Sequence, residues 1–178
     1  MCSRMINLLV FSDSHGDLRG MQTAVARQLA LPSAERPHYI LFLGDGVRDF
    51  ERLEAVDSLG ASLLAVRGNC DALGVQSTPE LRIPTFANVR AVMMHGHRFS
   101  VKEGLERAVN FSVSNQADLL LFGHTHRPFF ERLEKGDRVG GVSLEKPLTM
   151  LNPGSIREGS FGVLQLSEKG IFGSHGTV

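Results

Sequence analysis

Apolar and polar positions are grouped in blocks along this chain: five runs of about four apolar residues each lead into a short polar cluster. The runs cover residues 8–11, 40–43, 63–66, 91–94 and 119–122. A run of this length bounded by turn-forming residues is typical of a strand buried on both faces. The pattern therefore predicts five buried strands, each followed by a polar loop.

The polar clusters after these runs contain residue types that commonly bind metals in proteins. They are Asp13, His15, Asp45, Asn69, His95, His124 and His126. Ligands of open α/β sheets bind beyond the carboxyl ends of the strands. The sequence therefore predicts that these side chains share one rim, and a set of carboxylate, amide and imidazole groups indicates a metal site.

Helical periodicity appears between the predicted strands. Asp17 is the expected N-cap of a helix that ends before Pro32. A second helix is expected over residues 49–59 with Gly60 as its C-cap, and a third over roughly 101–116. The order strand, helix, strand implies parallel neighbours joined by right-handed crossovers.

The pattern changes after His126. Short apolar segments separated by Gly or Pro cover residues 129–134, 139–144, 148–151, 161–166 and 171–172. Such segments are typical of antiparallel strands. Two sheets packed face to face, with helices outside them, would accommodate both halves of the chain, so the predicted fold class is α/β.

Composition narrows the classes of function. A chain of 178 residues, 42% hydrophobic and 21% charged, is long enough to form one domain with a full core. Lys plus Arg and Asp plus Glu both total 19, so no net charge attracts a polynucleotide or an anionic membrane over a distance. A small, locally recognised anion is the expected partner. No apolar segment of signal-peptide length precedes Asp13, and Cys2 and Cys70 give no disulfide framework, which together predict a cytoplasmic protein.

The ordered motifs resemble those of a known family. They are Asp13-x-His15, Gly44-Asp45, Gly68-Asn69-Cys70-Asp71, His95 and Gly123-His124-x-His126. Together they resemble the calcineurin-like metallophosphoesterases. The compact Gly-Asn-Cys-Asp and His-Gly-His sequences, and Asn-Pro-Gly-Ser at residues 152–155, are similar to the small YfcE-like phosphodiesterases. The match spans residues 5 to about 166.

The resemblance implies a fold, an activity and a cofactor. The implied fold is a four-layer α-β-β-α sandwich of two mixed sheets, with residues 1–178 as a single metallophosphoesterase domain. The implied activity is hydrolysis of a small phosphodiester by a hydroxide that bridges two divalent metal ions. Mixed oxygen and imidazole ligands without thiolate favour Mn, with Fe, Co, Ni, Zn or Mg as alternatives.

The resemblance also assigns ligands residue by residue. Asp13, His15, Asp45 and His126 would hold one ion, and Asp45, Asn69, His95 and His124 the other. Asp45 would bridge the pair, because a carboxylate can share its two oxygens and its charge. Asp45, Asn69 and His95 would form the catalytic set within these ligands.

Three further residues are expected beside the metals or against the substrate. Many relatives have His where Cys70 stands, and a thiol is a weaker acid for a poor leaving group, which favours diesters with good leaving groups. Cys70 as a small buried hydrophobe behind the metals is the alternative. Asp71 could orient a neighbour or a water. His97 could be a metal ligand, a partner of a ligand or a substrate contact, and contact with a ligand residue or with solvent is favoured.

Two other functions are possible on the same sequence. One is a phosphomonoesterase or protein phosphatase that uses the same metal pair. The Cys at position 70 argues against this function. The other is a metal-free interaction scaffold, like the related retromer subunit. The intact set of ligand residues argues against this function. A homo-oligomer is possible, and anion contacts by Arg48, Arg67, Arg98 and Arg157 stay open.

Overall fold

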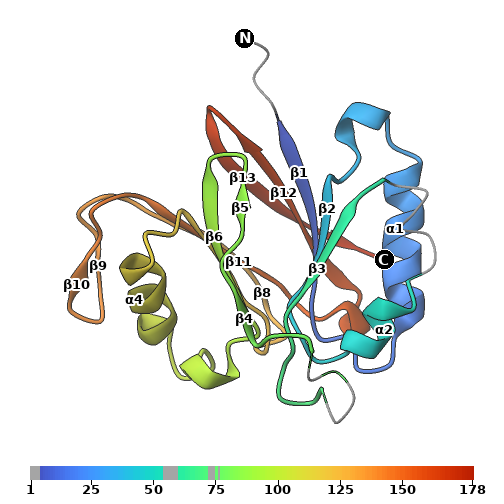
Figure 1. Ribbon diagram of the computed structural model, residues 1–178, viewed down its shortest axis with the longest axis horizontal. Coiled ribbons are helices and arrows are strands. Elements are labelled where there is room, and N and C mark those ends of the chain that lie inside the picture. Colours follow the sequence, from blue (N-terminus) through green and yellow to red (C-terminus); the bar gives the residue numbers. More distant parts are fainter. Residues whose placement is uncertain (1–4, 54–59, 72–74, 76) are drawn as a thin grey trace.

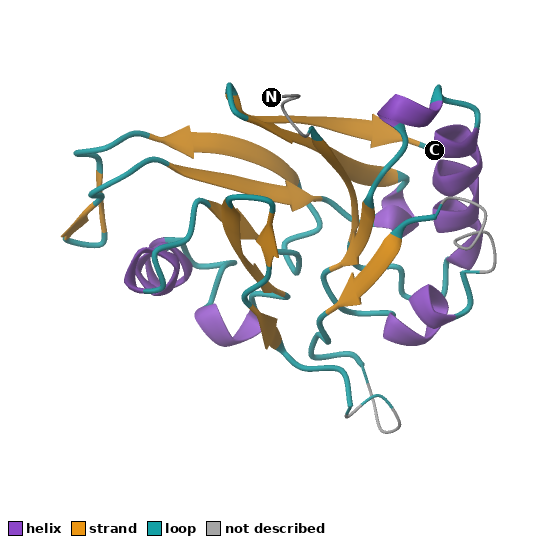
Figure 2. Cartoon of the chain, turned by 45° about the horizontal axis from the view of Figure 1, so that its top comes forward, coloured by secondary structure: helices purple, strands orange, loops and turns teal. Residues whose placement is uncertain are grey.

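Two β-sheets pack face to face, and helices cover the outer side of each sheet (Figure 1). The computed structural model describes residues 5–53, 60–71, 75 and 77–178. In both views α1 and α2 lie outside one sheet and α4 lies outside the other (Figure 2). The expected four-layer arrangement of two mixed sheets is confirmed.

The first sheet has the strand order β13-β12-β1-β2-β3. Strands β1 (Ile6–Phe11), β2 (Tyr39–Phe42) and β3 (Ser62–Ala65) run parallel, so the loops after them leave from the same edge. Strands β12 (Ser160–Ser167) and β13 (Gly170–Thr177) extend the sheet antiparallel on the other side of β1.

The second sheet has the strand order β4-β6-β7-β11-β8, with β5 paired to β6. The strands are β4 (Leu81–Arg82), β5 (Thr85–Phe86), β6 (Val89–Met94), β7 (Leu119–Leu121), β8 (Pro128–Leu133) and β11 (Leu148–Pro153). The parallel trio β6, β7 and β11 presents its carboxyl ends at one edge. The expectation that all strands after His126 are antiparallel is therefore wrong for β11, which is parallel to β7 although antiparallel to β8.

Helix α1 (Leu18–Leu29) matches its prediction, including the cap, because the Asp17 carboxylate accepts the N–H of Gly20 at 3.1 Å. Helix α2 (Val47–Glu51) begins two residues before its predicted start, and residues 54–59 of that prediction lie outside the described residues. Short 3-10 helices are η1 (Ser33–Glu35), η2 (His97–Phe99) and η3 (Ile156–Glu158).

The third predicted helix is shorter than expected. Helix α4 covers Glu106–Ser114, and residues 101–103 form a turn instead. Ser100 has a left-handed φ of 53°, and Gly104 lowers helix propensity, so the periodic apolar pattern does not continue as helix across this segment.

Three apolar layers hold the sandwich together. Leu8, Leu41, Met93, Leu121 and Leu151 belong to the cluster between the sheets. Leu9, Phe11, Met21 and Phe42 belong to the cluster under α1 and α2, and Val92, Met94, Val109 and Leu120 to the cluster under α4. Alternate residues of β1 thus pack in different layers, as the two-residue period of a strand requires.

Two strand predictions need correction. The run at 63–66 is not buried on both faces, because β3 is an edge strand of its sheet and Leu63 is 42% exposed. Residues 139–144 form two short strands, β9 (Arg138–Val139) and β10 (Val142–Ser143), because Gly140 and Gly141 turn the chain with positive φ. No helix in the described ranges is long and apolar enough to cross a membrane.

Candidate metal centre

A first group of metal-binding side chains consists of Asp13, His15 and His126. Asp13 and His15 follow β1 of the first sheet, and His126 follows β7 of the second. The Nε2 atoms of His15 and His126 lie 3.3 Å apart, and His126 Nε2 lies 3.2 Å from Asp13 Oδ1. Side chains from both sheets therefore meet at the shared edge.

A second group consists of Asp45, His95 and His124. These residues follow β2, β6 and β7. His95 Nε2 lies 3.3 Å from Asp45 Oδ2 and 3.1 Å from His124 Nδ1. This group also draws on both sheets.

The two groups adjoin one another through their carboxylates. Asp45 Oδ2 lies 3.3 Å from His95 Nε2 in its own group and 3.9 Å from His15 Nε2 in the other. Asp13 Oδ1 likewise lies 3.9 Å from His95 Nε2. A single carboxylate oxygen of Asp45 thus faces imidazole nitrogens of both groups.

One buried atom at the centre has an unsatisfied hydrogen-bonding capacity. Asp13 Oδ1 has no hydrogen-bond partner among the described residues, although Asp13 is fully buried. The other oxygen, Oδ2, accepts from the Ser12 hydroxyl at 2.5 Å and the His124 amide at 3.1 Å. A buried carboxylate oxygen without a donor is costly unless a cation offsets its charge. Carboxylate and imidazole donors also suit a first-row divalent metal, so the residues present fit the implied ions.

The backbone is strained at the same residues. Five of the eight described non-glycine residues with positive φ belong to the two groups: Asp13, His15, Asp45, His124 and His126. A left-handed conformation costs a residue with a Cβ about 1 kcal/mol or more. Such strain is concentrated at functional sites, where it aims side chains that regular strand geometry would send elsewhere.

Close approach of the two loops requires glycine. A Cβ on Gly68 would lie 2.1 Å from Asp45 Oδ1, and one on Gly44 would lie 2.6 Å from the Gly68 amide nitrogen. Both glycines of these motifs therefore permit tight strand ends. The loops after β2 and β3 therefore pack backbone to backbone behind Asp45.

Hydrogen bonds fix the orientation of His95. Its Nδ1 lies 2.7 Å from the carbonyl oxygen of Leu43, and because a carbonyl only accepts, Nδ1 carries a proton and donates. Nε2 therefore faces the two carboxylates. A metal-binding histidine commonly has this arrangement, with the second ring nitrogen bonded to a backbone carbonyl.

The charges in the cluster shift each other's pKa values. Burial raises the pKa of Asp45, but the hydrogen bond and charge of His95 outweigh burial and hold the pKa below its usual range. Burial raises the pKa of Asp13 above its usual range, against the charge of His95. Burial and the charge of His95 lower the pKa of His124 to about 4, so its nitrogen lone pairs are available at neutral pH.

Asp71 holds the loops rather than facing the two groups. Its Oδ2 accepts the amides of Asp45 at 2.8 Å and Gly68 at 2.7 Å, and its Oδ1 accepts those of Gly46 and Val47, both at 2.8 Å. One carboxylate thus joins the loop after β2 to the loop after β3. Of the two roles left open for Asp71, a neighbour or a water, these contacts involve a neighbour, the backbone around Asp45.

Other positioning residues were missed by sequence reasoning. Asp49 accepts from the Ser14 hydroxyl and the Gly16 amide, and Ser155 donates to the Asp13 carbonyl. Glu158 lies 3.4 Å from His126 Nδ1. Asp49 and Glu158 lie outside the recognised motifs, whereas Ser155 belongs to the Asn-Pro-Gly-Ser motif but had no predicted contact. The Asn152 amide donates to the Gly123 carbonyl and the Thr125 hydroxyl, so the Asn-Pro-Gly-Ser motif at 152–155 also supports the His124 loop.

The remaining predicted site residues lie at the rim. Asn69 is exposed, and its amide donates to Cys70 Sγ at 3.3 Å. Cys70 is also exposed, which contradicts its alternative as a buried hydrophobe, and its sulfur lies within 4.8 Å of a side-chain nitrogen of His15 and a carboxylate oxygen of Asp45. Partial burial and the Asp45 carboxylate raise the pKa of Cys70 to about 11. The His97 ring lies 5.5 Å from the His95 ring, and its Nδ1 has no partner in the described part of the chain.

Comparison with a family model decides the classification. The model described as the calcineurin-like phosphoesterase superfamily domain matches residues 6–168. The chain belongs to the calcineurin-like phosphoesterase superfamily. Membership implies hydrolase activity and divalent metal ions. The matched range contains every residue of the two groups.

Individual relatives agree with this classification. The chain is 28% identical to phosphodiesterase YfcE of Escherichia coli, over 94% of this chain and 96% of that protein. It is also 28% identical to the probable metallophosphoesterase YsnB of Bacillus subtilis, over 85% and 76% of the two chains.

Solved structures show the same fold. A predicted phosphoesterase from Streptococcus pneumoniae superposes with a TM-score of 0.62 at 19% identity, covering 98% of this chain and 99% of the other. Vacuolar protein sorting 29 from Cryptosporidium parvum superposes with a TM-score of 0.67 at 16% identity, again covering 98% and 99%.

Proposed function

We propose that this protein is a phosphodiesterase that uses two divalent metal ions, with Mn favoured. The observation that carries the proposal is the position of Asp45 Oδ2, within 4 Å of an imidazole nitrogen of each group. Such a carboxylate can be shared by two cations and reduce their mutual repulsion. Similarity to a relative named phosphodiesterase supports the diester class.

In this proposal Asp13, His15, Asp45 and His126 hold one ion, and Asp45, Asn69, His95 and His124 hold the other. The ions, when bound, would neutralise the phosphate oxygens and lower the pKa of the attacking water. Asn69 would have to turn its amide away from Cys70 Sγ so that its carbonyl oxygen faces the centre.

The protein's own residues give the proposed site its shape. The Leu43 carbonyl orients His95, and the Asp71 carboxylate positions Asp45 and Gly68 through their amides. A cavity of about 270 Å³ lies against His15, Asp45 and Cys70 and is open to solvent, which gives a substrate phosphate access to the centre. Cys70, with its high pKa, stays a neutral thiol at pH 7 and is a poor proton donor to a leaving alkoxide.

The test compares ester classes under metal control. Purified protein is first treated with chelator. Its hydrolysis of bis(4-nitrophenyl) phosphate, a diester, and of 4-nitrophenyl phosphate, a monoester, is then measured without Mn and again with Mn. The proposal predicts Mn-dependent hydrolysis with a higher kcat/KM for the diester. A higher kcat/KM for the monoester would favour the phosphomonoesterase alternative. No metal binding and no hydrolysis of either ester would favour the interaction scaffold.

A further inference from the structure

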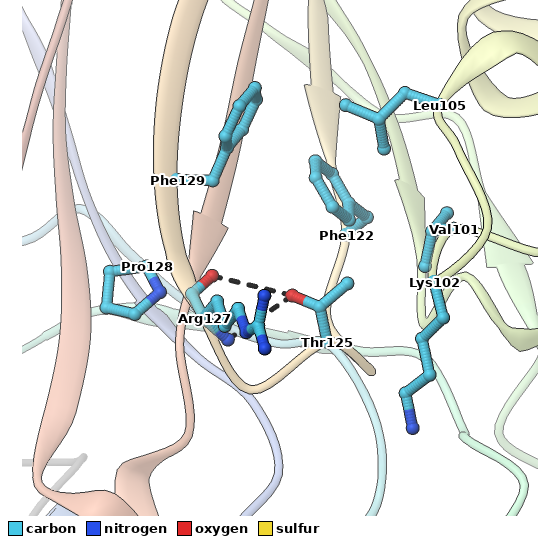
Figure 3. Close-up of a pocket in the computed structure, with 8 residues that line it drawn as sticks. All are labelled: Val101, Lys102, Leu105, Phe122, Thr125, Arg127, Pro128 and Phe129. Carbon is cyan, nitrogen blue, oxygen red and sulfur yellow. Dashed lines mark hydrogen bonds between the residues drawn. The ribbon is translucent and has the colours of Figure 1, made fainter.

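A second cavity, of about 570 Å³, is lined in part by Thr125 and Arg127, which belong to the loop that contains His124 and His126 (Figure 3). Its apolar lining includes Val101, Leu105, Phe122 and Phe129. The Phe122 and Phe129 rings are tilted by 57° with centroids 6.0 Å apart. Pockets of roughly 300–1,000 Å³ with an apolar lining and a few polar groups are typical of small-molecule sites.

The cavity has two chemically different ends. In Figure 3 the rings of Phe122 and Phe129 lie toward one end with Leu105, while the Lys102 amine, Arg127 and Thr125 lie toward the other. The Thr125 hydroxyl is held by the Asn152 amide at 3.0 Å and by the Arg127 backbone amide at 3.3 Å. The polar end is therefore built on a fixed loop.

This polar end adjoins the candidate metal centre. Thr125 stands between His124 and His126 in the chain, so the cavity wall and the two histidines share one loop. A molecule with its phosphate at the metals could extend past Thr125 into the cavity.

Both cations at this end lack an anionic partner. Among the described residues no carboxylate pairs with Lys102 or Arg127, whereas Lys146 pairs with Asp118 and Arg132 with Glu134. Exposed cations beside an aromatic surface are complementary to a ligand that is both aromatic and anionic.

We propose that this pocket binds one organic group of the phosphodiester, and that this group is aromatic and carries a further negative charge. The inference rests on the proposed function for its link to catalysis. The aromatic part lies against Phe122 and Phe129, and the anionic substituent lies beside Lys102 and Arg127. The substrate class is thereby narrowed to aryl or heteroaryl diesters with an additional carboxylate, sulfonate or phosphate.

Binding without metal tests the ligand class independently of catalysis. The full-length, chelator-treated protein is titrated with 2-naphthoate and with neutral 2-naphthamide by calorimetry. Phe129→Ala should raise the Kd of both probes about three- to tenfold, the range expected for one aromatic contact. Phe130→Ala is the matched control, because Phe130 is the next residue of β8, on the opposite face, with its ring over Gly173.

The charge requirement has its own pair of variants. A double substitution, Lys102→Gln with Arg127→Gln, should weaken 2-naphthoate about threefold or more and leave 2-naphthamide unchanged. Lys169→Gln, at an exposed lysine that does not line the cavity, should change neither Kd. Equal effects of Phe129→Ala and Phe130→Ala, or no difference between the two probes in the double variant, would overturn the inference.

An activity measurement links the pocket to the substrate. Two 4-nitrophenyl diesters are compared with Mn, one with phenyl and one with 3-carboxyphenyl as the second group, so that the leaving group is constant. The wild type should prefer the carboxylated diester, and the double variant should lose that preference. Hydrolysis of neither diester while 2-naphthoate still binds would overturn the proposed function alone. Hydrolysis of both at equal rates would overturn the pocket inference alone.

Discussion

At the scale of single residues, Cys70 is the position with the sharpest consequence for substrate choice. Its thiol has a pKa raised to about 11 by partial burial and Asp45, so at neutral pH it donates a proton poorly. An enzyme without a good protein acid should show rates that fall steeply as the leaving-group pKa rises.

Cys70→His should therefore flatten that dependence, because an imidazole has an ordinary pKa of about 6.5. Aryl diesters should be cleaved faster than alkyl diesters by the wild type, and the gap should narrow in the variant. The measurement is kcat/KM over a series of leaving groups at fixed Mn. Equal slopes in both proteins would mean that residue 70 has no acid role.

His126 gives a second prediction, because its φ of 60° lies in the left-handed region, which is unfavourable for a residue with a Cβ. Asn tolerates the left-handed region better. His126→Asn should lower Mn-dependent activity by about a hundredfold or more, yet leave the thermal midpoint of the chelator-treated protein unchanged or higher. His38→Asn is the control, since His38 is exposed outside both groups and should preserve activity. A clearly lower midpoint in His126→Asn would contradict the idea that strain at this position serves the site.

At the scale of elements, the loops after β2 and β3 act as one unit through Asp71. Four backbone amides converge on this carboxylate, and their N–H groups would lose their acceptors if it were replaced. Unsatisfied amides each cost about 1–3 kcal/mol when they are buried. Without the Asp71 carboxylate, the two loops are therefore expected to shift relative to one another.

Asp71→Ala should accordingly destabilise the protein by about 2–4 kcal/mol and lower activity, because Asp45 would no longer be fixed. Chemical unfolding and kcat report the two effects. Asp137→Ala, which removes a carboxylate that accepts one exposed amide, should cost under about 1 kcal/mol and spare activity. Similar losses of stability and activity in the two variants would contradict the claim that Asp71 holds the two loops together.

The sequence predicted the buried strands β1, β2, β6 and β7 and the cap of α1, because buried strands and caps have strong local patterns. Six of the seven predicted ligand residues meet at one edge, whereas Asn69 is exposed with its amide on Cys70. It did not predict the exposed edge strand β3 or the parallel pairing of β11, since both depend on the order of strands across the sheets. It also missed Asp49 and Glu158 and the contact of Ser155 with Asp13, because these contacts join loops distant in the chain. The cavity at Phe129 was missed for the same reason.

At the scale of the whole molecule, each group contains residues from both sheets. Ions held there would cross-link the two sheets and should stabilise the folded protein. At about 100 times Kd, one bound ion contributes about 2.7 kcal/mol, which corresponds to a rise in Tm of roughly 5–10 °C. Thermal unfolding with chelator and with Mn measures the difference, and an unchanged Tm would contradict a link between the sheets.

The central claim is that one carboxylate, Asp45, joins two metal sites. The most direct measurement is the metal content of the purified protein by mass spectrometry, for wild type, Asp45→Asn and the surface control Asp118→Asn, each after reconstitution with Mn. The account predicts two ions per chain in the wild type and in Asp118→Asn, and weakened binding at both sites in Asp45→Asn together with loss of diesterase activity. A single ion in the wild type, or an Asp45→Asn protein that keeps two ions and normal turnover, would contradict it.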